Sequence, residues 1–133
     1  MKIHLASIME PHNFAQNGRL IGIIHGRKPF KLKVDWHLPQ ITPSVEILES
    51  YKKDKEIDPS SAGKTFVKSY RQQLDRFFSE VKSESQRTGK SVMEILPFQE
   101  NDTLISWERG HNNNYRKVLA EYLKDLGFEV LVN

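Results

Sequence analysis

The stretch TLISWERGHNNNYRKVLAEYLKDLGFEVLV, residues 103–132, decides the fold. Its first part, Thr103–Trp107, is rich in apolar side chains and predicts a strand. After a polar loop, Tyr115–Leu126 carries apolar residues at i, i+3, i+4, i+7, i+8 and i+11, which is the spacing of one buried helix face. Gly127 marks the end of that helix, and Phe128–Val132 predicts a second strand. We therefore predict a βαβ unit with a right-handed crossover.

The loop of this unit, Trp107–Tyr115, is the predicted ligand site, because such sites lie outside the carboxyl ends of the strands. Asn113 or Asn114 is the expected N-cap of the helix, so Arg116 and Lys117 fall in its first turn. A cation there faces the positive end of the helix dipole, at a cost of roughly 0.3–1 kcal/mol. We therefore expect an anion nearby, either a carboxylate of the chain or a bound phosphate or carboxylate ligand.

Two more strands are predicted upstream, at Lys2–Met9 and at the apolar run Leu20–His25. Between them, Glu10–Arg19 collects Pro, Asn and Gly and is predicted to be a loop. The segment Gly26–Gln40 contains two prolines and is predicted to be a long irregular connection. No helix is predicted between the first two strands, which leaves a mixed sheet open.

Two helix starts follow, at Thr42–Pro43 and at Asp58–Pro59, where a capping side chain precedes a proline. The second leads into a long apolar stripe at helical spacing, which ends at Thr88–Gly89. A capping box at Ser91–Glu94 predicts a further short helix. The 133 residues therefore predict a single α/β domain, residues 1–133, with a mostly parallel four-stranded sheet.

Composition limits the classes of function. The formal charge of +3 is far from the dense basic surface of a typical nucleic-acid binder, and no apolar run is long enough to cross a membrane. The chain has no cysteine, so disulfides and thiolate chemistry are excluded. Its five histidines lack metal-ligand spacing, and its glycines form no dinucleotide or Walker pattern. We therefore expect a cytoplasmic protein without a metal or a cofactor.

Spaced motifs run along nearly the whole chain: Arg27-x-Pro29; Pro43 and Leu48 before Tyr51-Lys52; Tyr70 with Leu74-Asp75; and, at the end, Ser106-Trp107-Glu108, Asn114-Tyr115-Arg116 and Val118–Leu123. In these motifs the chain resembles the bacterial and phage family known as domain of unknown function 488. The resemblance implies a Rossmann-like three-layer α/β sandwich with a ligand site at the loop that begins at Trp107. It implies no established reaction.

The closing motifs also depart from that family, whose members typically carry Cys-x-Glu and then Cys-His-Arg. Glu108 and Arg116 match this pattern, whereas Ser106, Asn114 and Tyr115 stand at the two cysteine positions and the histidine position. Chemistry that needs the thiol or the imidazole is therefore unavailable here. The resemblance thus favours a binding protein on an enzyme-like scaffold.

The candidate ligand-binding residues follow strand ends or carry suitable side chains. Arg27, just past a strand, offers a bidentate fork for phosphate. Trp36 and Trp107 are suited to stacking on a base or sugar, or else to partial burial in the core. Tyr70 either projects its hydroxyl toward the site or packs in the core. The full set of candidates is His12, His25, Arg27, Trp36, Tyr70, Ser106, Trp107, Glu108, His111, Asn112, Asn113, Asn114 and Arg116.

Within the loop, His111 can contact an anion or transfer a proton, although such a histidine is more often simply solvated. Asn112–Asn114 can form an anion-binding nest, although asparagine is also common in turns and caps. Glu108 and His111 are the two weak candidates for catalysis, and no Ser–His–Asp pattern surrounds Ser106. We assign no catalytic residue.

The leading hypothesis is a protein that binds a small anionic ligand, such as a nucleotide or nucleotide-derived molecule. If the source is a phage, sequestering a nucleotide signal of host defence is one version of this hypothesis. The first alternative is a hydrolase or glycosidase that acts on the same ligand class through Glu108 or His111. The second is nucleic-acid binding through Arg27, Lys28 and neighbouring lysines interleaved with aromatic residues. A homodimer is expected as readily as a monomer.

Overall fold

The computed structural model describes residues 1–7, 14–15, 17–23, 34–91, 95, 98–106 and 115–132. The strands are β1 (Lys2–Ser7), β2 (Leu20–Gly22), β3 (Trp36–His37), β4 (Asp102–Ser106) and β5 (Glu129–Val132). The helices are the short 3₁₀ turn η2 (Pro39–Ile41), α1 (Val45–Ile57), α2 (Pro59–Thr88) and α4 (Tyr115–Asp125). The predicted capping-box helix at Ser91–Glu94 falls almost wholly outside the described residues.

The strands form one sheet in the order β3-β2-β4-β1-β5, and every neighbouring pair is parallel. The predicted α/β class with a Rossmann-like sandwich is confirmed, but the sheet has five strands where four were predicted. A mixed sheet is ruled out because β1 and β2 are not neighbours: β4 lies between them and is parallel to both. The predicted irregular connection 26–40 was wrong at its end, where β3 and η2 form.

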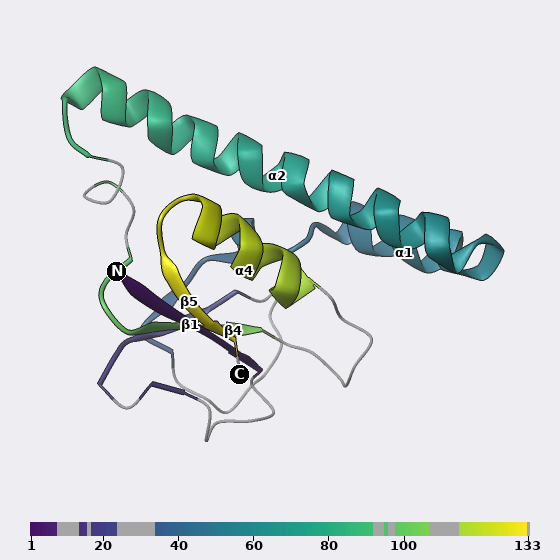
Figure 1. Cartoon of the computed structure of the whole chain (residues 1–133), viewed down its shortest axis with the longest axis horizontal. Coiled ribbons are helices and arrows are strands. Elements are labelled where there is room, and N and C mark those ends of the chain that lie inside the picture. The colour runs from purple at the N-terminus through teal and green to yellow at the C-terminus, as the bar shows by residue number, and fades with distance from the viewer. Residues whose placement is uncertain are drawn as a thin grey trace.

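The helices cover one face of this sheet. Figure 1 shows α4 beside the strands and α2 beyond it, on the same side. The described residues thus supply the sheet and one layer of helices. The connections from β1 to β2 and from β2 to β3 lie mostly outside the described ranges. In the same view the α1–α2 hairpin projects past the carboxyl ends of the strands.

The helix-facing row of the sheet builds the core. Ile3 and Leu5 of β1, Leu104 of β4 and Ile21 of β2 are 0% exposed, and residues paired in register point to the same face. One buried stripe of α2 consists of Ala62, Phe66, Tyr70, Leu74 and Phe78, and all of these except Ala62 belong to the same core cluster as the row. Burying these side chains is the main favourable contribution to folding.

The closing strand–helix–strand unit is confirmed. The predicted face of α4 is buried along Tyr115, Val118, Leu119, Tyr122 and Leu123, and Leu126 just beyond the helix packs against the same core. The chain then turns at a glycine, residue 127, with φ 105°, a backbone conformation that side chains with a Cβ rarely adopt. The two strands of the unit are parallel to each other, although β1 lies between them.

Of the two helix starts predicted from a capping residue before proline, one is confirmed and the other is displaced. Asp58 caps α2, because its carboxylate accepts a hydrogen bond from the Ser61 N–H and Pro59 is the first helical residue, as predicted. The predicted start at Thr42–Pro43 was wrong by two residues. There the N-cap is Ser44, whose hydroxyl accepts from the Ile47 N–H 3.2 Å away, while Thr42 is extended.

An ion pair anchors the amino end of the sheet. Asp102, 0% exposed, receives two hydrogen bonds from the Arg19 guanidinium, Nε to Oδ1 at 3.0 Å and Nη2 to Oδ2 at 2.8 Å. The Gln99 N–H donates to the same carboxylate. Hydrogen bonding to Asp102 raises the pKa of Arg19 above its ordinary value, against the opposing effect of burial. This pair ties the residue that precedes β2 to the first residue of β4.

Candidate functional site

Three strands end side by side on the edge of the sheet where the sequence predicts a site. Ser7, the last residue of β1, pairs in register with Ser106, the last residue of β4. On the other side of β4, Gly22 of β2 pairs with Ile105, and the Ile23 N–H donates to the Ile105 carbonyl at 2.9 Å. The carboxyl ends of β1, β2 and β4 therefore meet within one register step.

The chain leaves two of these neighbouring strands in opposite directions. From β1 it continues to β2, which lies beyond β4, whereas from β4 it continues through α4 to β5, which lies beyond β1. These two connections cross, because each passes over the other strand. The connections that diverge are those of β2 and β4, which lead to β3 and β5 at opposite edges of the sheet. Adjacent parallel strands with diverging connections define a topological switch point, and ligands of open α/β sheets bind outside it. In this chain the switch point lies between β2 and β4, so that Ser106 ends one of its two strands and Ser7 ends the next strand.

The serines that end β1 and β4 are both buried, Ser7 with 3% and Ser106 with 0% of its surface exposed. The Ser106 hydroxyl donates to the Ala6 carbonyl at 3.4 Å, which is long for an O–H···O hydrogen bond. Because they pair in register, the two side chains point to the same face of the sheet as Leu5 and Leu104. A small hydroxyl thus ends each of the two central strands, on the side that α4 covers.

The first residues of α4 lie next along the chain after the loop that leaves β4. Tyr115 is buried, and its ring meets that of Tyr70 edge-on with centroids 6.2 Å apart. Arg116 follows and is half-buried, whereas Lys117 is exposed. An 11-residue helix has N–H groups in its first turn that lack helical acceptors, together with the positive end of the dipole. Arg116 adds a full positive charge at this position.

Tyr70 has a clear structural place. It is 0% exposed in the middle of α2, and its hydroxyl donates to the Ile41 carbonyl at 2.5 Å. The ring also contacts Phe66, in a tilted arrangement with centroids 6.0 Å apart, and Tyr115 edge-on. Tyr70 therefore fills the core and ties α2 to η2, which is the alternative weighed for it in the sequence. It supports the amino end of α4 through its contact with Tyr115.

Trp36 likewise lies in the core-facing row. It pairs with Ile21, which pairs with Leu104, and Leu104 pairs with Leu5, so all four residues point to the helix-covered face. Trp36 is half-buried and packs against the core cluster. Because β2 and β4 separate β3 from β1, the indole lies about three strand spacings, roughly 14 Å, from β1. This position suits packing at the edge of the sheet.

The other candidates fall on the segments that follow β1, β2 and β4. Outside the described residues lie His12, His25, Arg27, Trp107, Glu108, His111, Asn112, Asn113 and Asn114. Their assignment therefore stays a prediction. Of the described candidates, Ser106 ends β4 at the switch point and Arg116 lies in the first turn of α4. Ser7 was missed, because only the strand order, which a local pattern does not give, places it beside Ser106.

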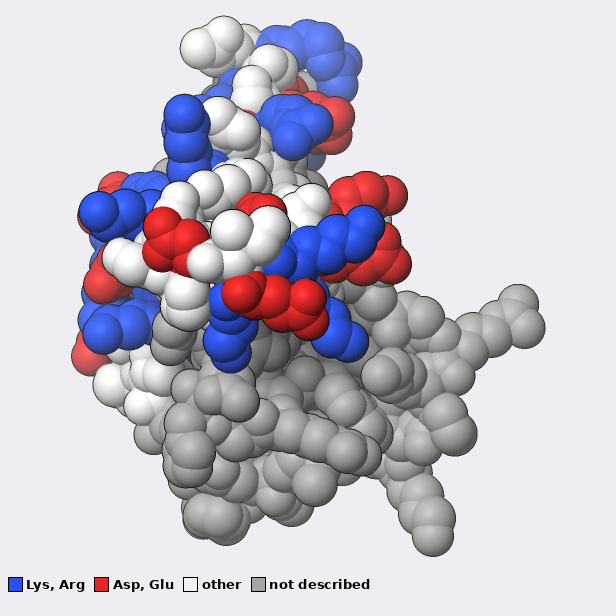
Figure 2. Space-filling model, turned by 90° about the vertical axis from the view of Figure 1, so that its right-hand side faces the viewer, with Lys and Arg blue, Asp and Glu red and all other residues white. Residues whose placement is uncertain are grey.

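The described surface around this end carries both signs of charge. Figure 2 faces the end of the molecule toward which the α1–α2 hairpin projects, and Lys and Arg are interspersed there with Asp and Glu. Between α1 and α2 lies a small hollow of about 140 Å³, lined by apolar residues including Tyr51 and Phe66 and by carboxylates including Glu46 and Asp54. Neither feature resembles a continuous basic surface for a nucleic acid.

Comparison with known protein families, with curated proteins and with solved structures finds no match to this chain. Among the described residues, no helix is long and apolar enough to span a bilayer, and no group of three potential ligands is arranged to hold a metal ion.

Proposed function

We propose that this protein binds a small anionic ligand, a nucleotide or a nucleotide-derived molecule, at the carboxyl ends of β2, β4 and β1. The observation that carries the proposal is the switch point, where the connections from the adjacent parallel strands β2 and β4 diverge beside the paired residues Gly22 and Ile105. Ligands of open α/β sheets bind outside such a point without any specialised motif.

The sign of the ligand charge follows from the start of α4. The switch point is flanked by the connection that enters this helix, and a helix amino end attracts negative charge. Arg116 lies in that first turn and adds a positive charge there. A phosphate or carboxylate of the ligand could accept a bidentate pair of hydrogen bonds from the guanidinium.

The nucleotide class rests on the sequence of the loops around the crevice. Trp107 and Asn112–Asn114 follow β4, and Arg27 follows β2, which supplies an aromatic plane, amides and a second guanidinium within reach of one rim. The family resemblance adds the expectation of a site at this loop, with the family's thiol and imidazole replaced. Binding without chemistry, as in sequestration of a nucleotide signal by a phage protein, is the version that these replacements favour.

Calorimetric titration tests the proposal, with inorganic phosphate, AMP, ADP, cyclic nucleotides and NAD as probes. We expect at least one probe to bind the parent chain, and Arg116→Ala to weaken that binding by about 10- to 100-fold, the equivalent of a lost charged hydrogen bond of 1.5–3 kcal/mol. Lys117→Ala is the matched control, because it removes the same charge from the next, exposed position of the helix. It should weaken binding by about threefold or less.

The absence of binding by every probe would refute the proposal, and so would equal losses in the two variants. Recovery of the bound probe after denaturation separates a binder from an enzyme. A mass spectrum of the intact probe supports sequestration, whereas a hydrolysed product would refute binding without chemistry and favour the enzyme alternative, for which Glu108 and His111 are the candidates.

A further inference from the structure

The strand β5 (Glu129–Val132) forms one edge of the described sheet, with β1 on its inner side. Edge strands in monomeric proteins are often blunted by charged side chains, proline or a bulge, because their backbone groups can pair with another chain. β5 has no lysine or proline, it pairs with β1 without a bulge, and its one charged side chain is Glu129 at its amino end. Its side chains include Leu131 and Val132, which are 39% and 48% exposed.

The backbone of β5 leaves a defined pair of residues facing outward. The Glu129 N–H donates to the Met1 carbonyl, so the backbone groups of Glu129 and, two residues on, Leu131 point toward β1. The N–H and C=O groups of Val130 and Val132 therefore point away from the sheet. No described strand lies beyond them.

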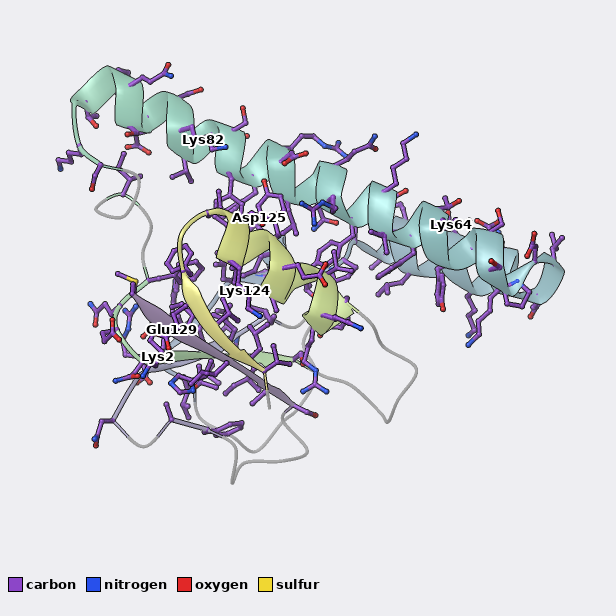
Figure 3. All side chains as sticks on the ribbon, viewed as in Figure 1. Lys2, Lys64, Lys82, Lys124, Asp125 and Glu129 are labelled. Atoms are coloured by element: carbon purple, nitrogen blue, oxygen red, sulfur yellow. The ribbon has the colours of Figure 1, made fainter. Side chains whose placement is uncertain are left out.

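The second face of the sheet is exposed at β5 and partly covered at β1. Lys2 and His4 of β1 are half-buried, and their in-register partners Glu129 and Leu131 are exposed. Figure 3 shows Lys2 and Glu129 together at the amino ends of their strands. Parallel sheets normally have both faces covered, so exposed side chains on β5 beside an unpaired edge point to a partner.

We propose that β5 pairs with β5 of a second copy of this chain, antiparallel across a two-fold axis at Leu131, to form a continuous ten-stranded sheet. In this register Val130 of each copy exchanges both backbone hydrogen bonds with Val132 of the other, which are the residues whose groups point outward. The two Leu131 side chains lie directly opposite each other on the second face. The valines pair on the helix-covered face.

The side chains select this register over the next one. A two-fold axis that preserves the faces of the sheet can lie at Val130 or at Leu131 but not between them, because paired residues must point to the same side. Centring on Val130 would set the Glu129 carboxylate against the apolar Leu131 of the other copy twice. Centring on Leu131 matches apolar with apolar at residues 130, 131 and 132, and it is therefore the self-complementary arrangement.

Because β5 has only four residues, we expect the dimer to be weak. Standard stable interfaces bury about 1,200–2,000 Å² in total, more than a short edge alone provides. The dimer should therefore dissociate on dilution, with a measurable monomer fraction in the micromolar range. Ligand binding at the switch point is not required for it, so the dimer stands or falls independently of the proposed function.

Sedimentation equilibrium of the full chain over a range of concentrations tests the dimer. Leu131→Lys and Leu131→Glu should each weaken self-association by about tenfold or more, because like charges then lie opposite each other at the axis. An equimolar mixture of the two variants should recover association, because opposite charges then meet. Leu48→Lys on α1 is the matched control: Leu48 is 38% exposed against 39% for Leu131, and its substitution should leave the dimer unchanged.

A parent chain that stays monomeric at several hundred micromolar would overturn the proposal. An extended segment of another protein would then be the remaining partner for β5. A dimer that survives Leu131→Lys unchanged would place the contact elsewhere. A dimer strengthened by Leu131→Lys alone would place the axis at Val130, with the new lysine opposite Glu129. Failure of the mixed variants to associate would also contradict the Leu131 register.

Discussion

At the scale of single residues, Gly18 shows how closely the chain packs at the amino end of the sheet. A Cβ built on Gly18 would lie 1.7 Å from the carbonyl oxygen of Asn101, which is a backbone atom and cannot swing aside. Asn101 itself has φ 65°, and its side chain lies 3.2 Å from the His4 ring. The glycine therefore provides room for two backbones to approach each other.

We predict that Gly18→Ala lowers the free energy of unfolding by about 1–3 kcal/mol, the usual cost of overpacking. Gly63→Ala is the contrasting variant, because nothing lies within 4 Å of a Cβ at this position inside α2. There alanine should raise the free energy of unfolding by about 0.5–1 kcal/mol through its higher helix propensity. Urea denaturation measures both, and equal effects of the same sign would contradict this account.

Residue identity alone indicated part of the candidate site. Ser106 and Arg116 were found because they flank a local strand–loop–helix pattern that can be read along the chain. Tyr70 has a hydroxyl that could serve a site or the core, and only the Ile41 carbonyl beside it in three dimensions shows which. Ser7 looked like one member of an alternating strand, because its partner is 99 positions away in the sequence.

At the scale of elements, the signals that succeeded are those confined to a few consecutive residues. The buried face of α4, the aspartate cap of α2 and the glycines that end both helices all act within one or two turns. β3 was missed because two residues, Trp36–His37, are too few to show alternation. It is a strand only because β2 lies alongside it.

A contact between two helices contributes to the stability of the fold. α2 and α4 are joined by the Tyr122 hydroxyl, which donates to the Asp75 carboxylate at 2.6 Å, while the Arg71 guanidinium lies 5.4 Å from the Tyr122 ring centroid. We predict that Tyr122→Phe lowers the free energy of unfolding at pH 7 by about 0.5–1.5 kcal/mol, the net value of one hydrogen bond. Chemical denaturation measures this loss.

The same tyrosine gives a pH dependence with a defined sign. Burial, and next the hydrogen bond to Asp75, raise the pKa of Tyr122 above its ordinary value near 10. Above about pH 10 the unfolded chain loses this proton while the folded chain retains it, so stability falls as pH rises. The difference in stability between the parent and Tyr122→Phe should therefore shrink from pH 7 to about pH 11. A constant or growing difference would contradict the assignment.

At the scale of the whole molecule, the strand order is what the sequence could not provide. Local patterns located four of the strands, but pairing depends on contacts between segments far apart, such as Ile3 with Asp102 and with Val130. The insertion of β4 between β1 and β2 creates the switch point, and the position of β5 creates the open edge. Both proposals for this protein therefore arise from topology.

Local stability also differs between parts of the molecule. No residue of α1, which the structure describes in full, is completely buried, whereas β4 is buried along its whole length. α1 packs mainly on α2, through contacts such as the tilted ring pair Tyr51–Phe66 at 5.1 Å. We therefore expect the amides of α1 to exchange with solvent through local opening, and those of β1 and β4 only through global unfolding.

The Gln73 side chain fixes the segment that precedes α1. The Gln73 amide donates to the carbonyls of Gln40 and Thr42 at 3.0 and 2.6 Å and accepts from the Ser44 N–H at 2.9 Å. Gln73→Ala removes all three bonds next to the N-cap of the helix, and each is worth about 0.5–1.5 kcal/mol. Hydrogen exchange should become roughly 10- to 100-fold faster across α1, with a smaller change in β1 and β4.

Gln72→Ala is the control for this last prediction, because it makes the same change of residue type at the next, exposed position of α2. Any effect of helix propensity is then the same in both variants. The difference in exchange rate between them reports only the three hydrogen bonds of Gln73 to residues 40, 42 and 44. If exchange in α1 rose equally in both, the hairpin would be held by α2 as a whole. If it rose in β4 as much as in α1, the hairpin and the sheet would open as one cooperative unit, and the projecting helices would be part of the folding core.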